Sequence, residues 1–140
     1  MILIDFFPDI QVTPISSSLN EDPADGEPVT ITGWGKTGDA DGAAVVLQYS
    51  DTPTILDYES CKKPFGSSVT ENVVCIDATQ GGICNGDSGG PLNYPQPDGS
   101  YIQVGITSFG PSTGCEQGLP SVFTRVSSYN DWILQTIGEA

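Results

Sequence analysis

Short apolar segments recur along this chain, and the turns that separate them constrain its fold more than any other feature. Residues 29–34 (VTITGW) begin with apolar and polar side chains in alternation, which is the period of a β-strand. The 140 residues include 17 glycines and 11 prolines, which favour turns and leave little room for long helices. The strands that we predict from this pattern are residues 1–7, 29–34, 45–55, 72–77, 91–94, 101–109 and 121–126.

Two further segments predict helices. Residues 56–63 (LDYESCKK) favour a short helix. Near the end of the chain, one helical face carries the side chains of Tyr129, Trp132, Ile133, Thr136 and Ile137. We therefore predict a single all-β domain of six or seven short strands, followed by a C-terminal helix that lies on them. A chain of this length is sufficient for one core.

The charge of the chain excludes one class of partner. Eighteen acidic residues against four basic ones give a formal net charge of -14. Such an acidic surface repels phosphate backbones, so we expect no nucleic-acid partner. The acidic run at residues 20–27 predicts a solvated loop. We also expect no membrane partner and no signal peptide in this chain, because residues 1–7 lack the basic start and the length of a secretion signal.

The cysteines point to an oxidising environment. Four of them, Cys61, Cys75, Cys84 and Cys115, allow three pairings if all are bridged. The chain has no histidine and no Cys-x-x-Cys motif, so the cysteines are poorly suited to a zinc site. Two disulfides in an extracellular protein explain the four cysteines better. We therefore expect no metal and no cofactor.

Residues 84–92 (CNGDSGGPL) form a glycine-rich motif around one serine. A serine hydroxyl attacks a carbonyl only when a base takes its proton and donors stabilise the oxyanion. The flanking glycines would let the amides of Gly86 and Ser88 converge on one point, where one donor is worth about 3 to 4 kcal/mol. A buried Asp87 carboxylate would need a cation or several donors. The alternative is a glycine-rich turn without chemistry.

The motif resembles the active-serine sequence of chymotrypsin-like serine proteases, which is G-D-S-G-G-P after a cysteine. Residues 29–37 (VTITGWGKT) are similar to a V-x-G-W-G-x-T strand of that family, and residues 106–133 resemble its C-terminal part, with Phe109 replacing the usual tryptophan. The run GCE…PSVFTRV resembles arthropod digestive chymotrypsins and crustacean collagenolytic proteases most closely.

The resemblance implies a fold. It is the C-terminal Greek-key β-barrel half of a two-barrel protease, with a short intermediate helix and a C-terminal helix. Residues 1–140 would then form a partial serine-protease domain. The implied disulfides are Cys61–Cys75 and Cys84–Cys115, while Val29 and Tyr94 occupy the positions of a third bridge.

The resemblance also implies roles. Ser88 would be the nucleophile, and the amides of Gly86 and Ser88 would form the oxyanion hole. Asp87 would support that loop; in the family this residue pairs with the ammonium of a processed N-terminus, for which we find no counterpart in this chain. The substrate pocket would be formed by Gly82, Ile83, Ser108, Phe109, Gly110 and Ser121. None of these is charged, which predicts a preference for apolar or aromatic side chains, with a narrower, elastase-like pocket at Ile83 as the alternative.

The catalytic base is missing from this chain. In the family, the histidine and aspartate precede the serine, and the chain contains no histidine. One hypothesis is that the chain is the truncated C-terminal half of a secreted serine endopeptidase and is inactive alone. The complete enzyme would cleave proteins or peptides and would be a target of protein inhibitors. Its N-terminal barrel would then be missing. The other is that it is a non-catalytic protease homologue that binds peptides or partner proteins.

Overall fold

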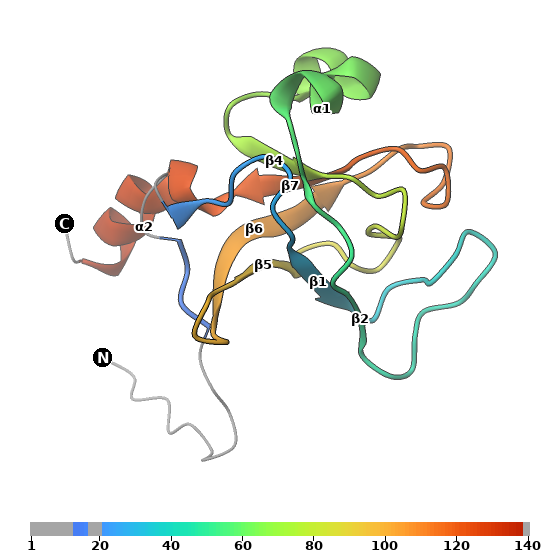
Figure 1. The fold of residues 1–140 in the computed structure, drawn as a ribbon, viewed down its shortest axis with the longest axis horizontal. Coiled ribbons are helices and arrows are strands. Elements are labelled where there is room, and N and C mark those ends of the chain that lie inside the picture. The colour runs from blue at the N-terminus through green and yellow to red at the C-terminus, as the bar shows by residue number, and fades with distance from the viewer. Residues whose placement is uncertain (1–12, 17–20, 139–140) are drawn as a thin grey trace.

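The computed structural model describes residues 13–16 and 21–138, so the predicted strand at residues 1–7 lies outside the described part. Seven antiparallel strands form one sheet in the order β2-β1-β5-β6-β7-β4-β3 (Figure 1). The strands are β1 (Thr30–Gly33), β2 (Gln48–Ser50), β3 (Ile55–Leu56), β4 (Val73–Ile76), β5 (Pro91–Pro95), β6 (Tyr101–Phe109) and β7 (Ser121–Arg125).

The sheet closes on itself into a barrel. A bridge between Pro28 and Thr54 joins the residues just before β1 to those just before β3. There the amide of Val29 donates to the carbonyl of Pro53 at 3.0 Å, and the amide of Ile55 donates to that of Glu27 at 2.9 Å. Only β2 extends beyond the closed part. The prediction of an all-β barrel is therefore confirmed.

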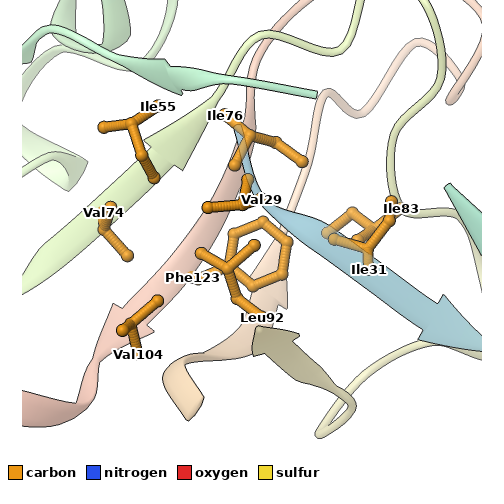
Figure 2. Packing of buried hydrophobic residues seen from close by; sticks show 9 residues of the cluster. All are labelled: Val29, Ile31, Ile55, Val74, Ile76, Ile83, Leu92, Val104 and Phe123. Carbon is orange, nitrogen blue, oxygen red and sulfur yellow. The ribbon is translucent and has the colours of Figure 1, made fainter. Parts of the chain in front are cut away.

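The barrel encloses one main apolar core (Figure 2). It consists of Val29, Ile31, Ile55, Val74, Ile76, Ile83, Leu92, Val104 and Phe123. Leu92 and Phe123 are fully buried, and burying a side chain of this size stabilises the fold by about 1.5 to 3 kcal/mol. The strands can approach here because β6 carries Gly105, whose Cβ would lie 3.0 Å from the Cβ atoms of both.

Helix α1 (Tyr58–Phe65) follows β3 and is held at its start and at its middle. At its start, the Asp57 carboxylate accepts a hydrogen bond from the Ser60 amide at 2.9 Å. Hydrogen bonding from Ser60 lowers the pKa of Asp57 below its ordinary value. A disulfide between Cys61 and Cys75 then ties the helix to β4. The helix was predicted at residues 56–63, so its existence is confirmed and its ends shift by two residues.

Two predictions about the surface are wrong. The segment 45–55, predicted as one strand with an edge or a bulge at Pro53, forms the strands β2 and β3 with residues 51–54 between them, and Val45 is 96% exposed. Helix α2 (Asn130–Ile137) exists as predicted, but it has no buried residue, and its Trp132 is 64% exposed. A helical apolar face therefore forms without strands to cover it. Within the described residues, no helix is long and apolar enough to cross a membrane.

The acidic run at residues 20–27 is also less solvated than predicted. Asp22 has a side chain only 7% exposed, and its carboxylate pairs with the guanidinium of Arg125 at 2.9 Å. The hydroxyls of Ser16 and Ser127 donate to the same carboxylate. This group therefore ties the segment before the barrel to the end of β7.

A hydrogen bond lies close to Val29 and Tyr94, the two positions at which the resemblance implies a third disulfide in other family members. Val29, at one of the two positions, is 1% exposed, and Tyr94, at the other, packs against the same core. The hydroxyl of Tyr94 donates to the Glu27 carboxylate at 2.6 Å. This bond lowers the pKa of Glu27 and raises the pKa of Tyr94 from their ordinary values. Packing and one hydrogen bond thus join the two strands that a disulfide would join.

Candidate active site

The glycine-rich turn after β4 has a backbone that demands its glycines. Gly86 has a φ of +103°, and a Cβ on it would lie 3.0 Å from the Cα of Gly35. The amide of Asp87 donates to the carbonyl of Cys84 at 3.1 Å, and the amide of Gly90 donates to that of Asp87 at 2.9 Å. These bonds form a tight turn that places Ser88 on the outside, where it is exposed.

The Asp87 carboxylate is held by backbone donors. One of its oxygens accepts the amide of Gly35 at 2.8 Å, and the other accepts the amide of Cys84 at 2.9 Å. A Cβ on Gly33 or on Gly35 would come within 3 Å of this carboxylate, so both positions require glycine. The requirement for several donors is thus met by the chain itself. Asp87 also borders a cavity of about 650 Å³.

A second cavity, of about 330 Å³, opens beside Ser88. We refer to it as the Ser88 cavity. Its lining comes from the end of β6 and from three loops, and consists of Lys36, Asp39, Ile83, Cys84, Asn85, Ser88, Thr107, Ser108, Phe109, Gly110, Pro111, Ser112, Gly114 and Cys115. Within the described residues, the amides of Gly86 and Ser88 donate to no other group. They are therefore free to meet an oxyanion.

The structure brings most of the predicted pocket residues together, with two exceptions. Ile83 and residues 108–110 line the Ser88 cavity. Gly82 borders the larger cavity instead, and Ser121 lines neither. Ser121 is 2% exposed, and its hydroxyl accepts the amide of Ile83 at 3.2 Å. It therefore supports the chain segment that carries Ile83.

Sequence reasoning missed the contribution of the loop after β1. Lys36 and Asp39 from this loop both line the Ser88 cavity. There the Asp39 carboxylate accepts a hydrogen bond from the amide of Cys115 at 2.7 Å. No local sequence pattern predicts this contact, because Asp39 and Cys115 are 76 positions apart.

A disulfide joins Cys84 to Cys115 in the wall of the Ser88 cavity. This pair and Cys61–Cys75 are the ones that the resemblance implies. The Asp39 carboxylate lies within 4.8 Å of both sulfurs of the Cys84–Cys115 bridge. Because these sulfurs are bonded to each other, they are not the thiolates that a metal would need.

Comparisons with known proteins agree with this geometry. Brachyurin from Leptuca pugilator is 48% identical over 115 residues, which are 81% of this chain and 48% of that protein. Chymotrypsin-like elastase family member 3B from Macaca mulatta is 46% identical over 113 residues, which cover 79% of this chain and 44% of that protein. The chain thus spans about half the length of these curated relatives.

The fold and the family model lead to the same conclusion. A solved structure of HL collagenase superposes with a TM-score of 0.81 and 30% sequence identity, over 96% of this chain and 57% of that one. The family model described as Trypsin matches residues 5–133, which are most of the chain. The resemblance read from the motifs is confirmed at this level: the chain belongs to the trypsin family.

Proposed function

We propose that this chain is the nucleophile-bearing half of a serine endopeptidase, with Ser88 as the residue that forms the acyl-enzyme. One observation carries the proposal. In a chain of the trypsin family, Ser88 is exposed at the mouth of a cavity and follows a turn that only glycine can form at Gly86. Relatives such as brachyurin and the elastases are serine endopeptidases.

The proposed reaction is an acyl transfer in two steps. The Ser88 hydroxyl oxygen attacks the carbonyl carbon of the scissile bond, and its proton passes to a base. The oxyanion that forms accepts hydrogen bonds from the free amides of Gly86 and Ser88. The amine leaves with the proton from the base, and water then hydrolyses the ester by the same route. The base would be a histidine, which this chain does not contain.

The base and its aspartate would come from an N-terminal barrel, which would correspond to the half of the relatives that this chain does not span. A large apolar surface supports this proposal. Trp34, Tyr49 and the three residues at 45–47 are all exposed, Val45 by 96% and Tyr49 by 73%. Exposed apolar patches of this kind mark interaction surfaces. Alone, the chain would retain only the oxyanion-hole and binding effects, roughly 10³ to 10⁴ over water.

The proposed substrate preference is for an apolar or aromatic side chain in the Ser88 cavity. Ile83 and Phe109 line this cavity with apolar side chains, and the two further positions that the resemblance assigns to the pocket, Gly82 and Ser121, carry no charge. The one carboxylate in the lining, that of Asp39, already accepts the amide of Cys115. Cleavage of phenylalanyl anilides in preference to arginyl anilides by the complete enzyme would support this, and the reverse preference would overturn it.

Labelling with a fluorophosphonate tests the catalytic proposal. Coding sequence that precedes Met1 in frame should include a histidine in an Ala-Ala-His-Cys-like segment, and the complete product should be labelled at Ser88. Ser88→Ala should abolish labelling, whereas Ser112→Ala, at an exposed serine of the same cavity, should not. The 140-residue chain should aggregate or stay unlabelled. Stoichiometric labelling of Ser88 in a monomeric sample of that chain would overturn the need for a second half.

A second function is favoured by the absence of histidine from the sequence. A chain without a base could use the Ser88 cavity to bind a peptide or a partner protein without cleaving it. A stop codon directly upstream of Met1 in the transcript would favour this homologue over the enzyme. For either function we propose an extracellular location, because two disulfides suit an oxidising compartment.

A further inference from the structure

Two loops that are distant in sequence exchange hydrogen bonds next to the Ser88 cavity. The Asp39 carboxylate accepts the amide of Cys115 at 2.7 Å, and the Glu116 carboxylate accepts the amide of Asp39 at 2.7 Å. Each loop therefore gives a carboxylate to the backbone of the other. We call this reciprocal pair the Asp39–Glu116 clamp.

The loop that carries Asp39 is braced within itself. Lys36 and Ala43 form a bridge across its base, and the hydroxyl of Thr37 donates to the Asp41 carboxylate at 2.8 Å. Figure 1 shows the loop projecting from the barrel beside β2, with the loop between β6 and β7 next to it. Asp39 is thus presented by a structured loop.

The loop between β6 and β7 depends on the clamp. Among the described residues, the hydrogen bonds that join residues 110–120 to the rest of the chain are the two of the clamp. The disulfide from Cys115 to Cys84 is its one covalent tie apart from the chain itself. A Cβ on Gly114 would overlap the Asp39 carboxylate, so this wall of the cavity lies directly against the clamp.

We propose that Asp39 and Glu116 are positioning residues that set the shape of the Ser88 cavity by holding its Cys115 wall. The role of this cavity in binding a substrate side chain rests on the proposed function. The loop after β1 would then control what the cavity accepts without touching the scissile bond. Loss of the clamp should widen the cavity and weaken its hold on a side chain.

Binding of indole, a neutral aromatic probe, to the full chain tests this role. Asp39→Ala removes the acceptor and should weaken binding by about 10-fold or more, because a hydrogen bond to a charged group is lost. Asp39→Asn keeps an acceptor oxygen and should restore binding to within about 3-fold of the unaltered chain. Asp51→Ala removes the same charge from an exposed residue outside this loop and should change nothing. Equal affinities for all variants would overturn the proposal.

A second measurement separates the clamp from the function of the cavity. In Asp39→Ala, hydrogen exchange at the Cys115 amide should accelerate, and dithiothreitol should reduce Cys84–Cys115 faster while Cys61–Cys75 is reduced at its usual rate. Glu116→Ala should accelerate exchange at the Asp39 amide and serves if Asp39→Ala does not fold. Unchanged exchange and reduction would overturn the clamp. Failure of the unaltered chain to bind indole, with these shifts present, would overturn the proposed apolar cavity instead.

Discussion

An acid at Gly82, which the resemblance assigns to the substrate pocket, would be a direct way to favour basic substrate side chains, yet the structure predicts that Gly82→Asp destabilises the barrel. A Cβ on Gly82 would lie 2.6 Å from the Cβ of Ala78 and 2.6 Å from the hydroxyl oxygen of Ser121. Both neighbours are buried, at 6% and 2% exposure. The first atom of any side chain at this position therefore meets two groups that have little freedom to move.

The magnitude follows from these two contacts. Non-bonded carbon atoms are most stable about 3.5 to 4.0 Å apart, so each neighbour must shift by about 1 Å. Inserting a group into a packed region in this way costs about 1 to 3 kcal/mol, which we expect for Gly82→Ala. Gly82→Asp adds the desolvation of a carboxylate and should cost at least about 3 kcal/mol. Out of a total of about 5 to 15 kcal/mol, that is a large loss.

Urea unfolding of the oxidised chain, followed by far-UV circular dichroism, gives the free energy of unfolding for each variant. Gly42→Ala is the matched control, because a Cβ there meets nothing within 4 Å. Adding Ser121→Gly removes one of the two contacts at Gly82, so the double-mutant cycle should show a favourable coupling of at least about 0.5 kcal/mol. A Gly82→Ala chain that is as stable as Gly42→Ala would refute the reasoning.

Three further predictions concern stability. Asp22→Ala removes the carboxylate that pairs with the Arg125 guanidinium and should cost about 2 to 3 kcal/mol in urea unfolding; a loss below about 0.5 kcal/mol would contradict this. Leu92→Ala opens a cavity in the core and should cost about 2 to 5 kcal/mol by the same assay, and a smaller loss would mean that the core collapses around it. The lowered pKa of Glu27 should contribute stability that is lost as pH falls from its ordinary value of 4.5, and the raised pKa of Tyr94 stability that is lost as pH rises from 10.0. In Tyr94→Phe, unfolding measured across pH should lose the alkaline dependence and show a weaker acid one, because the Ala24 amide still donates to Glu27, and an unchanged profile would contradict the assignment.

Much of the fold could be predicted from sequence because its determinants are local. Residues 101–109 were expected as a strand and form β6 with the same bounds, since apolar residues run between two turns. The break near Pro53 follows from the sequence as well, because proline disfavours the interior of a strand. The exposure of α2 could not be predicted in this way. It depends on which distant segment covers the surface, and a periodic apolar face does not say what lies against it.

In the candidate site too, features set by neighbouring residues could be predicted, and features set by distant residues could not. The turn around Ser88 was predictable because its glycines and its serine are adjacent in the chain. The clamp was not, because Asp39 and Glu116 are surface carboxylates separated by 77 positions. In a chain with a net charge of -14, two such acids look like any other solvated residues. Ser121 was placed in the pocket by resemblance, whereas the structure places it beneath Ile83 as a hydrogen-bond acceptor.

The place of β7 in the sheet has a consequence for how the chain assembles during synthesis. This strand is the last in sequence, yet it pairs with both β4 and β6 and so occupies the interior of the barrel wall. Until it is made, one edge of β4 and one edge of β6 stay unpaired, and the apolar faces there stay open to water. The barrel therefore cannot close until residues 121–125 have been made, which makes the last stage of its assembly late and slow.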